Sequence, residues 1–142
     1  MRKLAFLLLA LPCIVSFSFA QDKDEAAVRN VLAQQTKQWN DGNIPAFMDT
    51  YWKSDSLMFI GKSGITYGWQ KTMDNYKRSY PDTVTMGKLG FDLLEVKRLS
   101  TNFFFVVGKW HLSRSIGDIG GVFTLLFRKI NYKWVIVSDH SS

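Results

Sequence analysis

The stretch FFFVVGKWHLSR, residues 103–114, decides the fold class, because it has the pattern of one long β-strand. Side chains alternate between the two faces of a strand. One face here carries Phe104, Val106, Gly108, Trp110 and Leu112, whereas the other includes Lys109 and His111. The pattern predicts a strand with its Trp110 face in the core and its His111 face wet or in an interface.

Strand-like segments continue on both sides of this stretch, over residues 87–98, 121–130 and 133–140. They are rich in Phe, Val, Ile, Leu and Trp, and only the short connections LSTN, IGDIG and NYK separate them. Long strands with short connections predict an antiparallel meander. Glycines inside strands often mark bends, so Gly87, Gly90 and Gly108 indicate strong curvature.

The first half of the chain is predicted to be mainly helical. Apolar residues fall on one face at helical spacing in 22–39, where Asp22 and Glu25 resemble a capping box. A short helix with Pro45 in its first turn follows, then a hairpin of strands 57–60 and 65–68.

A third predicted helix starts near Trp69 and ends at Pro81, with Trp69, Met73, Tyr76 and Tyr80 in one stripe. A chain in which helices come first and the strands of a sheet come last is typical of the α+β class. We therefore expect a single α+β domain in which three helices pack into a strongly curved sheet.

Residues 1–20 have the features of a secretory signal peptide. Arg2 and Lys3 precede a short apolar run, and small residues at Ser18 and Ala20 fit cleavage after Ala20. We expect a periplasmic or secreted domain of residues 21–142 that has no membrane segment after cleavage. The only cysteine, Cys13, would leave with the signal, so hydrophobic burial rather than disulfides must stabilise the domain.

Charge and motifs exclude several classes of function. Without Arg2 and Lys3 the formal net charge falls from +6 to +4, and the basic residues form no run, so we expect no nucleic-acid partner. The two histidines show no metal-binding spacing, and no GxSxG nucleophile elbow is present. We expect no metal and no cofactor.

The order helix, helix, hairpin, helix, four strands resembles the nuclear transport factor 2-like superfamily, and locally a SnoaL-like branch of uncharacterised secreted bacterial proteins. The stretches that carry the resemblance are QWNDGN, AFMDTY, ITYGWQKTMDNYKRSYPD, MGKLGFDLLEV, VVGKWHLSR, GGVFTLLFRKI and KWVIVSDHSS. The resemblance implies a cone-shaped fold, a pocket inside the cone and a homodimer through the outer sheet face. It implies no single reaction, because the superfamily hosts isomerases, cyclases, dehydratases, binding domains and assembly domains.

The last strand ends in WVIVSDHSS, residues 134–142, and places an Asp beside a His. In regular alternation Trp134 and His140 share one face and Asp139 lies on the other, so Asp139 and His140 cannot form a dyad. With Trp134 in the core, His140 is predicted at the pocket mouth and Asp139 on the outer side. His140 and Asp55, in the turn before the first strand, are the candidate catalytic residues.

Aromatic side chains on inward faces are predicted to line the pocket and to bind the ligand together with His140. They are Trp39, Tyr51, Trp69, Tyr76 and Trp110. Ketosteroid isomerase-like members of the superfamily combine an Asp base with a Tyr and a protonated acid, and no such trio maps onto this sequence.

Three functions remain open. The first is a domain that binds a small apolar or aromatic molecule in the cone. The second is an isomerase, lyase or cyclase that acts on a hydrophobic carbonyl compound by acid/base chemistry, and the third is a dimeric assembly module. A carboxylate or His that meets a Tyr hydroxyl across an empty cavity would favour the enzyme. An interior filled by its own side chains would favour the assembly module.

Overall fold

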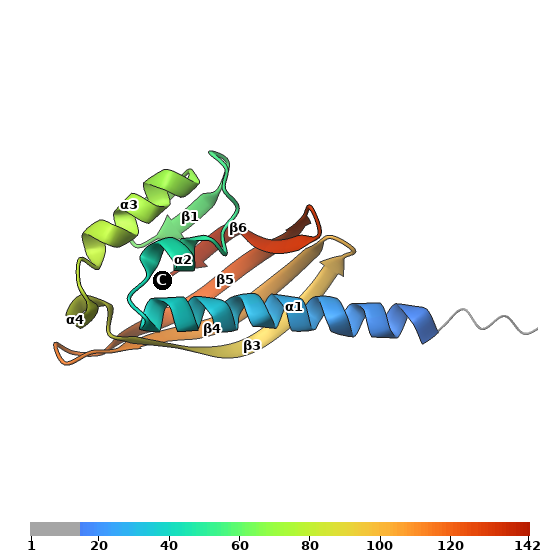
Figure 1. Ribbon diagram of the computed structural model, residues 1–142, viewed down its shortest axis with the longest axis horizontal. Helices are drawn as coiled ribbons and strands as arrows, with labels where there is room; N and C mark the ends of the chain where they lie inside the picture. Colours follow the sequence, from blue (N-terminus) through green and yellow to red (C-terminus); the bar gives the residue numbers. More distant parts are fainter. Residues whose placement is uncertain (1–14) are drawn as a thin grey trace, which may run out of the picture.

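The computed structural model describes residues 15–142, with side chains from residue 23 onward. Helices come first and a sheet last, which confirms the predicted α+β class (Figure 1). The helices are α1 (Val15–Asn40), α2 (Ile44–Met48), α3 (Trp69–Ser79) and α4 (Thr83–Met86). The strands are β1 (Met58–Gly61), β2 (Gly64–Tyr67), β3 (Lys88–Ser100), β4 (Phe103–Ser113), β5 (Ile119–Ile130) and β6 (Lys133–Ser141).

One curved sheet contains all six strands, in the order β2-β1-β6-β5-β4-β3. The four long strands form the predicted antiparallel meander, and the β1–β2 hairpin joins it through a parallel pairing of β1 with β6. The helices cover one face of this sheet, with α1 lying along it (Figure 1). Sheet and helices together form the predicted cone.

The first helix begins earlier than predicted. It starts at Val15 rather than near Asp22, because no Gly or Pro interrupts the residues between them. Asp22 therefore lies within the helix instead of capping it. Cleavage after Ala20 stays a prediction, and residues 1–14 of the expected signal peptide lie outside the described residues. No helix of the described chain is long and apolar enough to span a membrane.

The other helices follow local capping signals. Asn43 caps α2 by accepting a hydrogen bond from the backbone N–H of Ala46 at 3.0 Å, and Pro45 lies in the first turn as predicted. The short helix α4 was not predicted. Asp82 and Thr85 form a capping box there, directly after Pro81 has ended α3.

The core lies between α1, α2 and the concave face of the sheet. The predicted inward face of β4 is confirmed, because Phe104, Val106 and Leu112 are buried while Lys109 and His111 are exposed. The core also holds large side chains from every layer, among them Leu32, Met48, Phe123, Phe127 and Ile136.

Asp24, in the N-terminal half of α1, fixes this helix to the sheet. Its carboxylate pairs with Arg98 at 2.9 Å and with Lys129 at 2.8 Å, and it accepts a hydrogen bond from Trp134 Nε1 at 3.1 Å. Burial acts to raise the pKa of this carboxyl, but the hydrogen bonds outweigh it and hold the pKa below its usual value. The cluster therefore ties α1 to β3, β5 and β6.

A β-bulge in β6 changes which side chains at the end of the last strand point into the cone, so that they differ from the prediction. Leu126 of β5 lies opposite Ser138 and Phe127 lies opposite Ile136, so Val137 is an extra residue without a partner. The extra residue shifts the alternation by one position. Trp134 and Ile136 face inward as predicted, but beyond the bulge Asp139 faces inward and His140 outward. The predicted orientations of Asp139 and His140 are therefore wrong.

Candidate functional site

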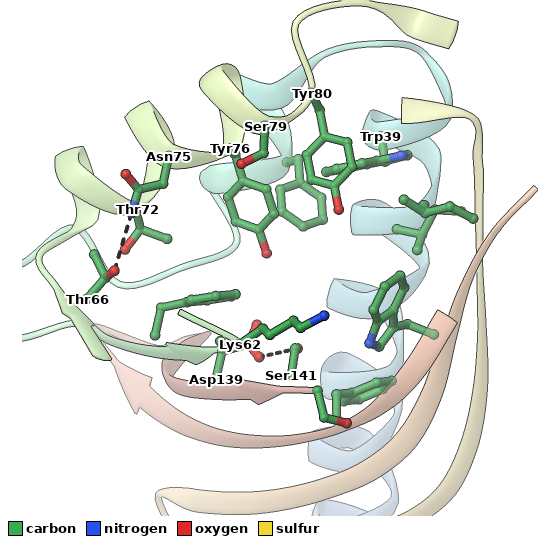
Figure 2. A pocket seen from close by; sticks show the side chains of 18 of the residues that line it. Trp39, Lys62, Thr66, Thr72, Asn75, Tyr76, Ser79, Tyr80, Asp139 and Ser141 are labelled. Atoms are coloured by element: carbon green, nitrogen blue, oxygen red, sulfur yellow. Dashed lines mark hydrogen bonds between the residues drawn. The ribbon is translucent and has the colours of Figure 1, made fainter. Parts of the chain in front are cut away.

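The cone encloses an open cavity of about 660 Å³ between the helices and the concave side of the sheet. Residues from α1, α2, α3 and all six strands contribute to its wall, and Figure 2 shows side chains that line it. The interior is therefore not filled by its own side chains.

Two aromatic walls face the cavity. On the helical side, Trp39, Phe47, Tyr76 and Tyr80 pack mainly edge to face, with ring centroids 4.9 to 5.9 Å apart for the edge-on pairs. On the sheet side the wall is made by Phe91, Trp110 and Phe123. Such packing fixes the rings in place, so the walls form a rigid apolar slot.

Asp139 provides the charge at the bottom of this slot. Its residue surface is only 4% exposed, and within the described chain it is the only acidic residue that lines the cavity. Tyr51 donates its hydroxyl to Oδ2 at 2.7 Å, and Ser141 donates its hydroxyl to Oδ1 at 2.7 Å. These two hydrogen bonds orient the carboxyl group.

The pKa of Asp139 is raised from 3.8 to about 6. Burial among apolar side chains disfavours the charged form, and this cause outweighs the stabilising hydrogen bonds from Tyr51 and Ser141 and the charge of the neighbouring His140. A carboxyl with this pKa exchanges its proton close to neutral pH, as a general acid or base must.

Three tyrosine side chains line the cavity, and two of them, Tyr51 and Tyr76, interact with Asp139. Burial, reinforced by the charge of Asp139, raises the pKa of Tyr51 and of Tyr76 well above the usual value. Burial also raises the pKa of Tyr80. Figure 2 shows the hydroxyls of Tyr76 and Tyr80 directed into the cavity, on the side facing Asp139. Both stay protonated at neutral pH, so they can donate hydrogen bonds to a bound molecule.

Four of the predicted ligand-binding residues line the cavity, namely Trp39, Tyr51, Tyr76 and Trp110. Trp69 does not. It lies on the same stripe of α3, but its Nε1 donates to the carbonyl of Met48 at 2.7 Å and Lys53 stacks over its ring, so it joins α3 to α2. Its predicted place in the pocket wall is wrong.

Neither predicted catalytic residue reaches the cavity. His140 is exposed on the outer face of the sheet because of the bulge at Val137. Asp55 is exposed in the turn before β1. His111 lies on the outer face of β4 as predicted, with its ring against Gly90 of β3.

Sequence reasoning missed the buried Asp139 and the Ser141 hydroxyl beside it. Both are displaced by the bulge, and no Gly or Pro in 133–141 indicates its position. Tyr80 was recognised as part of the α3 stripe but was not proposed as a ligand contact. Within the described part of the chain, no three His, Cys, Asp or Glu side chains come together to hold a metal ion.

Known structures resemble this chain closely in fold. An NTF-2 like protein of unknown function from Shewanella oneidensis MR-1 is 40% identical, with a TM-score of 0.79, and the match covers 85% of this chain and 98% of that protein. A ketosteroid isomerase-like protein from Erwinia carotovora atroseptica is 17% identical, with a TM-score of 0.65 over 84% of this chain and 95% of that one.

A third structure, the protein LinA, is 12% identical, with a TM-score of 0.73 over 88% of both chains. At these low identities the Erwinia protein and LinA show the fold alone. No protein-family model matches the sequence, and no curated protein matches it.

Asp139→Asn is expected to stabilise the protein near neutral pH. The folded pKa of about 6 lies above the ordinary 3.8, so the folded state binds more protons than the unfolded chain between these values. The free energy of unfolding therefore falls as pH rises through this window, by up to about 3 kcal/mol at about 1.4 kcal/mol per pH unit. Asn does not titrate, so the variant escapes this loss.

Urea unfolding over a range of pH measures the effect. The advantage of Asp139→Asn should vanish as pH falls below the usual Asp pKa. The control is Asp55→Asn, which alters an exposed side chain outside the cavity. A stability difference that is independent of pH would contradict the raised pKa.

Proposed function

This chain belongs to the nuclear transport factor 2-like family, and we propose that it binds a small, mainly apolar carbonyl compound in its cone and transfers a proton on it with Asp139 as general base. One observation carries the proposal. A buried carboxyl, hydrogen-bonded by Tyr51 at 2.7 Å, meets protonated tyrosines in an open aromatic cavity.

Size and lining of the cavity support ligand binding. About 660 Å³ lies within the range of roughly 300–1,000 Å³ that small-molecule sites occupy. Such sites are mostly apolar with a few convergent polar groups. Here the aromatic walls supply the apolar surface, and Asp139, Tyr76 and Tyr80 supply the polar groups.

The state of Asp139 supports catalysis rather than binding alone. A pKa of about 6 leaves the carboxylate free to accept a proton at neutral pH, while its burial keeps it more basic than an ordinary aspartate. No Lys or Arg is paired with it among the described ion pairs. Burial of the carboxylate at this position costs stability, because the hydrogen bonds from Tyr51 and Ser141 do not outweigh the loss of solvation.

The proposed step is enolisation. An Asp139 oxygen removes a proton from the carbon next to the carbonyl, and the C–H electron pair moves onto the carbonyl oxygen as an enolate. The Tyr76 or Tyr80 hydroxyl donates a hydrogen bond to that oxygen, where negative charge develops. Return of the proton to another carbon completes an isomerisation, and departure of a leaving group from the adjacent carbon completes an elimination.

A carbon acid that needs no specific recognition tests this proposal. In nitrobenzisoxazole, removal of one C–H proton forms a nitrile as the N–O bond breaks, and a coloured phenolate is released. We expect the protein to accelerate this reaction, with a rate that rises with pH and a midpoint near 6, since Asp139 must be ionised. Absorbance of the phenolate measures the rate.

Asp139→Asn should lose this acceleration, by at least about a hundredfold as for loss of a general base. The matched control is His140→Ala, which alters the neighbouring residue on the outer face and should retain full activity. Equal rates for the native protein and Asp139→Asn, or loss of activity only in His140→Ala, would contradict the role of Asp139.

We also propose that the domain is exported, is cleaved after Ala20 and works as a homodimer through the outer sheet face. This face carries solvent-exposed apolar side chains, including Ile65, Tyr67 and Val122, which are 55%, 59% and 53% exposed. Strand register places them on the same side as His140. Apolar patches of this kind often form protein interfaces.

Val122→Glu is expected to convert the dimer of residues 21–142 to a monomer, because it places a charge in the centre of an apolar interface. Light scattering measures the mass. Tyr132→Glu is the control, since Tyr132 is 96% exposed at the β5–β6 turn, outside this face. A native monomer, or equal effects of the two substitutions, would contradict the interface.

A further inference from the structure

The mouth of the cavity differs in charge from its bottom. The β1–β2 turn contributes Lys62 and Ser63, and the last turn of α3 contributes Arg78 and Ser79. All four are exposed while still lining the cavity. Figure 2 shows the Lys62 side chain reaching over the cavity, between the tyrosines of α3 and Ser141 of β6.

Only three charged side chains line the cavity within the described chain, and two of them are Lys62 and Arg78. Neither takes part in an ion pair formed by the described residues. The third is Asp139, which is buried, whereas both cations are exposed. The cavity is therefore cationic where it opens and anionic where the proposed chemistry occurs.

The position of Arg78 is fixed by a short hydrogen-bond chain. Its Nη1 donates to Asn75 Oδ1 at 3.0 Å, and Asn75 Nδ2 donates to Thr66 Oγ1 on β2 at 3.3 Å. All three residues line the cavity. The chain joins α3 to the hairpin that carries Lys62, so the two cations are held on neighbouring elements of one rim.

From this arrangement we infer that the ligand is an amphipathic organic acid, with an apolar body in the aromatic slot and a carboxylate bound by Lys62 and Arg78 at the mouth. This inference rests on the proposed function and names the class of its substrate. The carboxylate binds at the rim, where partial solvation keeps the cost of desolvating the ions small.

The charge of Asp139 reinforces this orientation. A carboxylate placed at the bottom of the cavity would meet a like charge in an apolar environment, which is strongly unfavourable. The acid therefore enters with its apolar, carbonyl-bearing end first. Asp139 disfavours the reversed orientation, and the cationic rim favours acids over neutral compounds of the same shape.

Two fluorescent probes with the same apolar body test the inference. Anilinonaphthalene sulfonate carries an anionic group, and phenylnaphthylamine lacks it. We expect Lys62→Gln to weaken binding of the sulfonate about twofold to fivefold, the range for loss of one exposed charge contact. Lys62→Gln with Arg78→Gln should remove the preference for the sulfonate. Neither variant should change the affinity of phenylnaphthylamine.

The controls separate failure of this inference from failure of the proposed function. Lys71→Gln removes an exposed charge from α3 outside the cavity and should leave both affinities unchanged. Val122→Glu alters the outer face and should also leave them unchanged.

If both probes bind but Lys62→Gln affects them equally or not at all, the inferred carboxylate-binding site is wrong, while the proposed pocket remains valid. If neither probe binds, or Val122→Glu abolishes binding of both, the ligand-binding cavity itself is contradicted, and this inference with it.

Discussion

One unpaired residue in the last strand determines what the cavity contains. Val137 has no partner in β5, so the alternation of side chains changes phase between Ile136 and Ser138. Before the bulge, β6 contributes Trp134 and Ile136 to the core. Beyond it, the same face of the sheet receives Asp139 and Ser141. A strand without the bulge would direct His140 into the cone and Asp139 away from it.

The rest of the site is consistent with this placement. Tyr51 lies just beyond α2, where its isolated bridge to Ile136 fixes the backbone beside β6 and allows its hydroxyl to reach Asp139. Burial disfavours the charged form of the carboxyl and raises its pKa to about 6. Stability lost by burying this charge is offset by the apolar contacts of the surrounding core, a balance typical of functional sites.

Much of the fold could be predicted from the sequence, because long periodic segments determine it. The alternation in 103–114 identified the inward face of β4, and the helical stripe from Trp69 identified α3. Short-range features were harder. The helix α4 depends on a four-residue capping box after Pro81, and the start of α1 depends on the absence of a break before Asp22.

The site was less predictable than the fold, for physical reasons. Alternation predicts which face of the sheet a side chain occupies only while the strand pairing is regular. A bulge that contains no Gly or Pro cannot be recognised from the sequence. For this reason the prediction placed His140 in the cavity and Asp139 on the outer face, whereas the structure has the reverse. Trp69 was assigned to the cavity because it shares the stripe of Tyr76, but a helix stripe is wide enough to contact both the cavity and a neighbouring helix.

The central claim is that Asp139 is a buried base inside the cone, and an NMR titration of the side-chain carboxyl carbons tests it most directly. The Asp139 resonance is identified by its absence in Asp139→Asn. The account predicts that this carboxyl titrates with a midpoint near 6. A midpoint in the ordinary Asp range, near 4, would show that water reaches the carboxyl freely and would contradict the account.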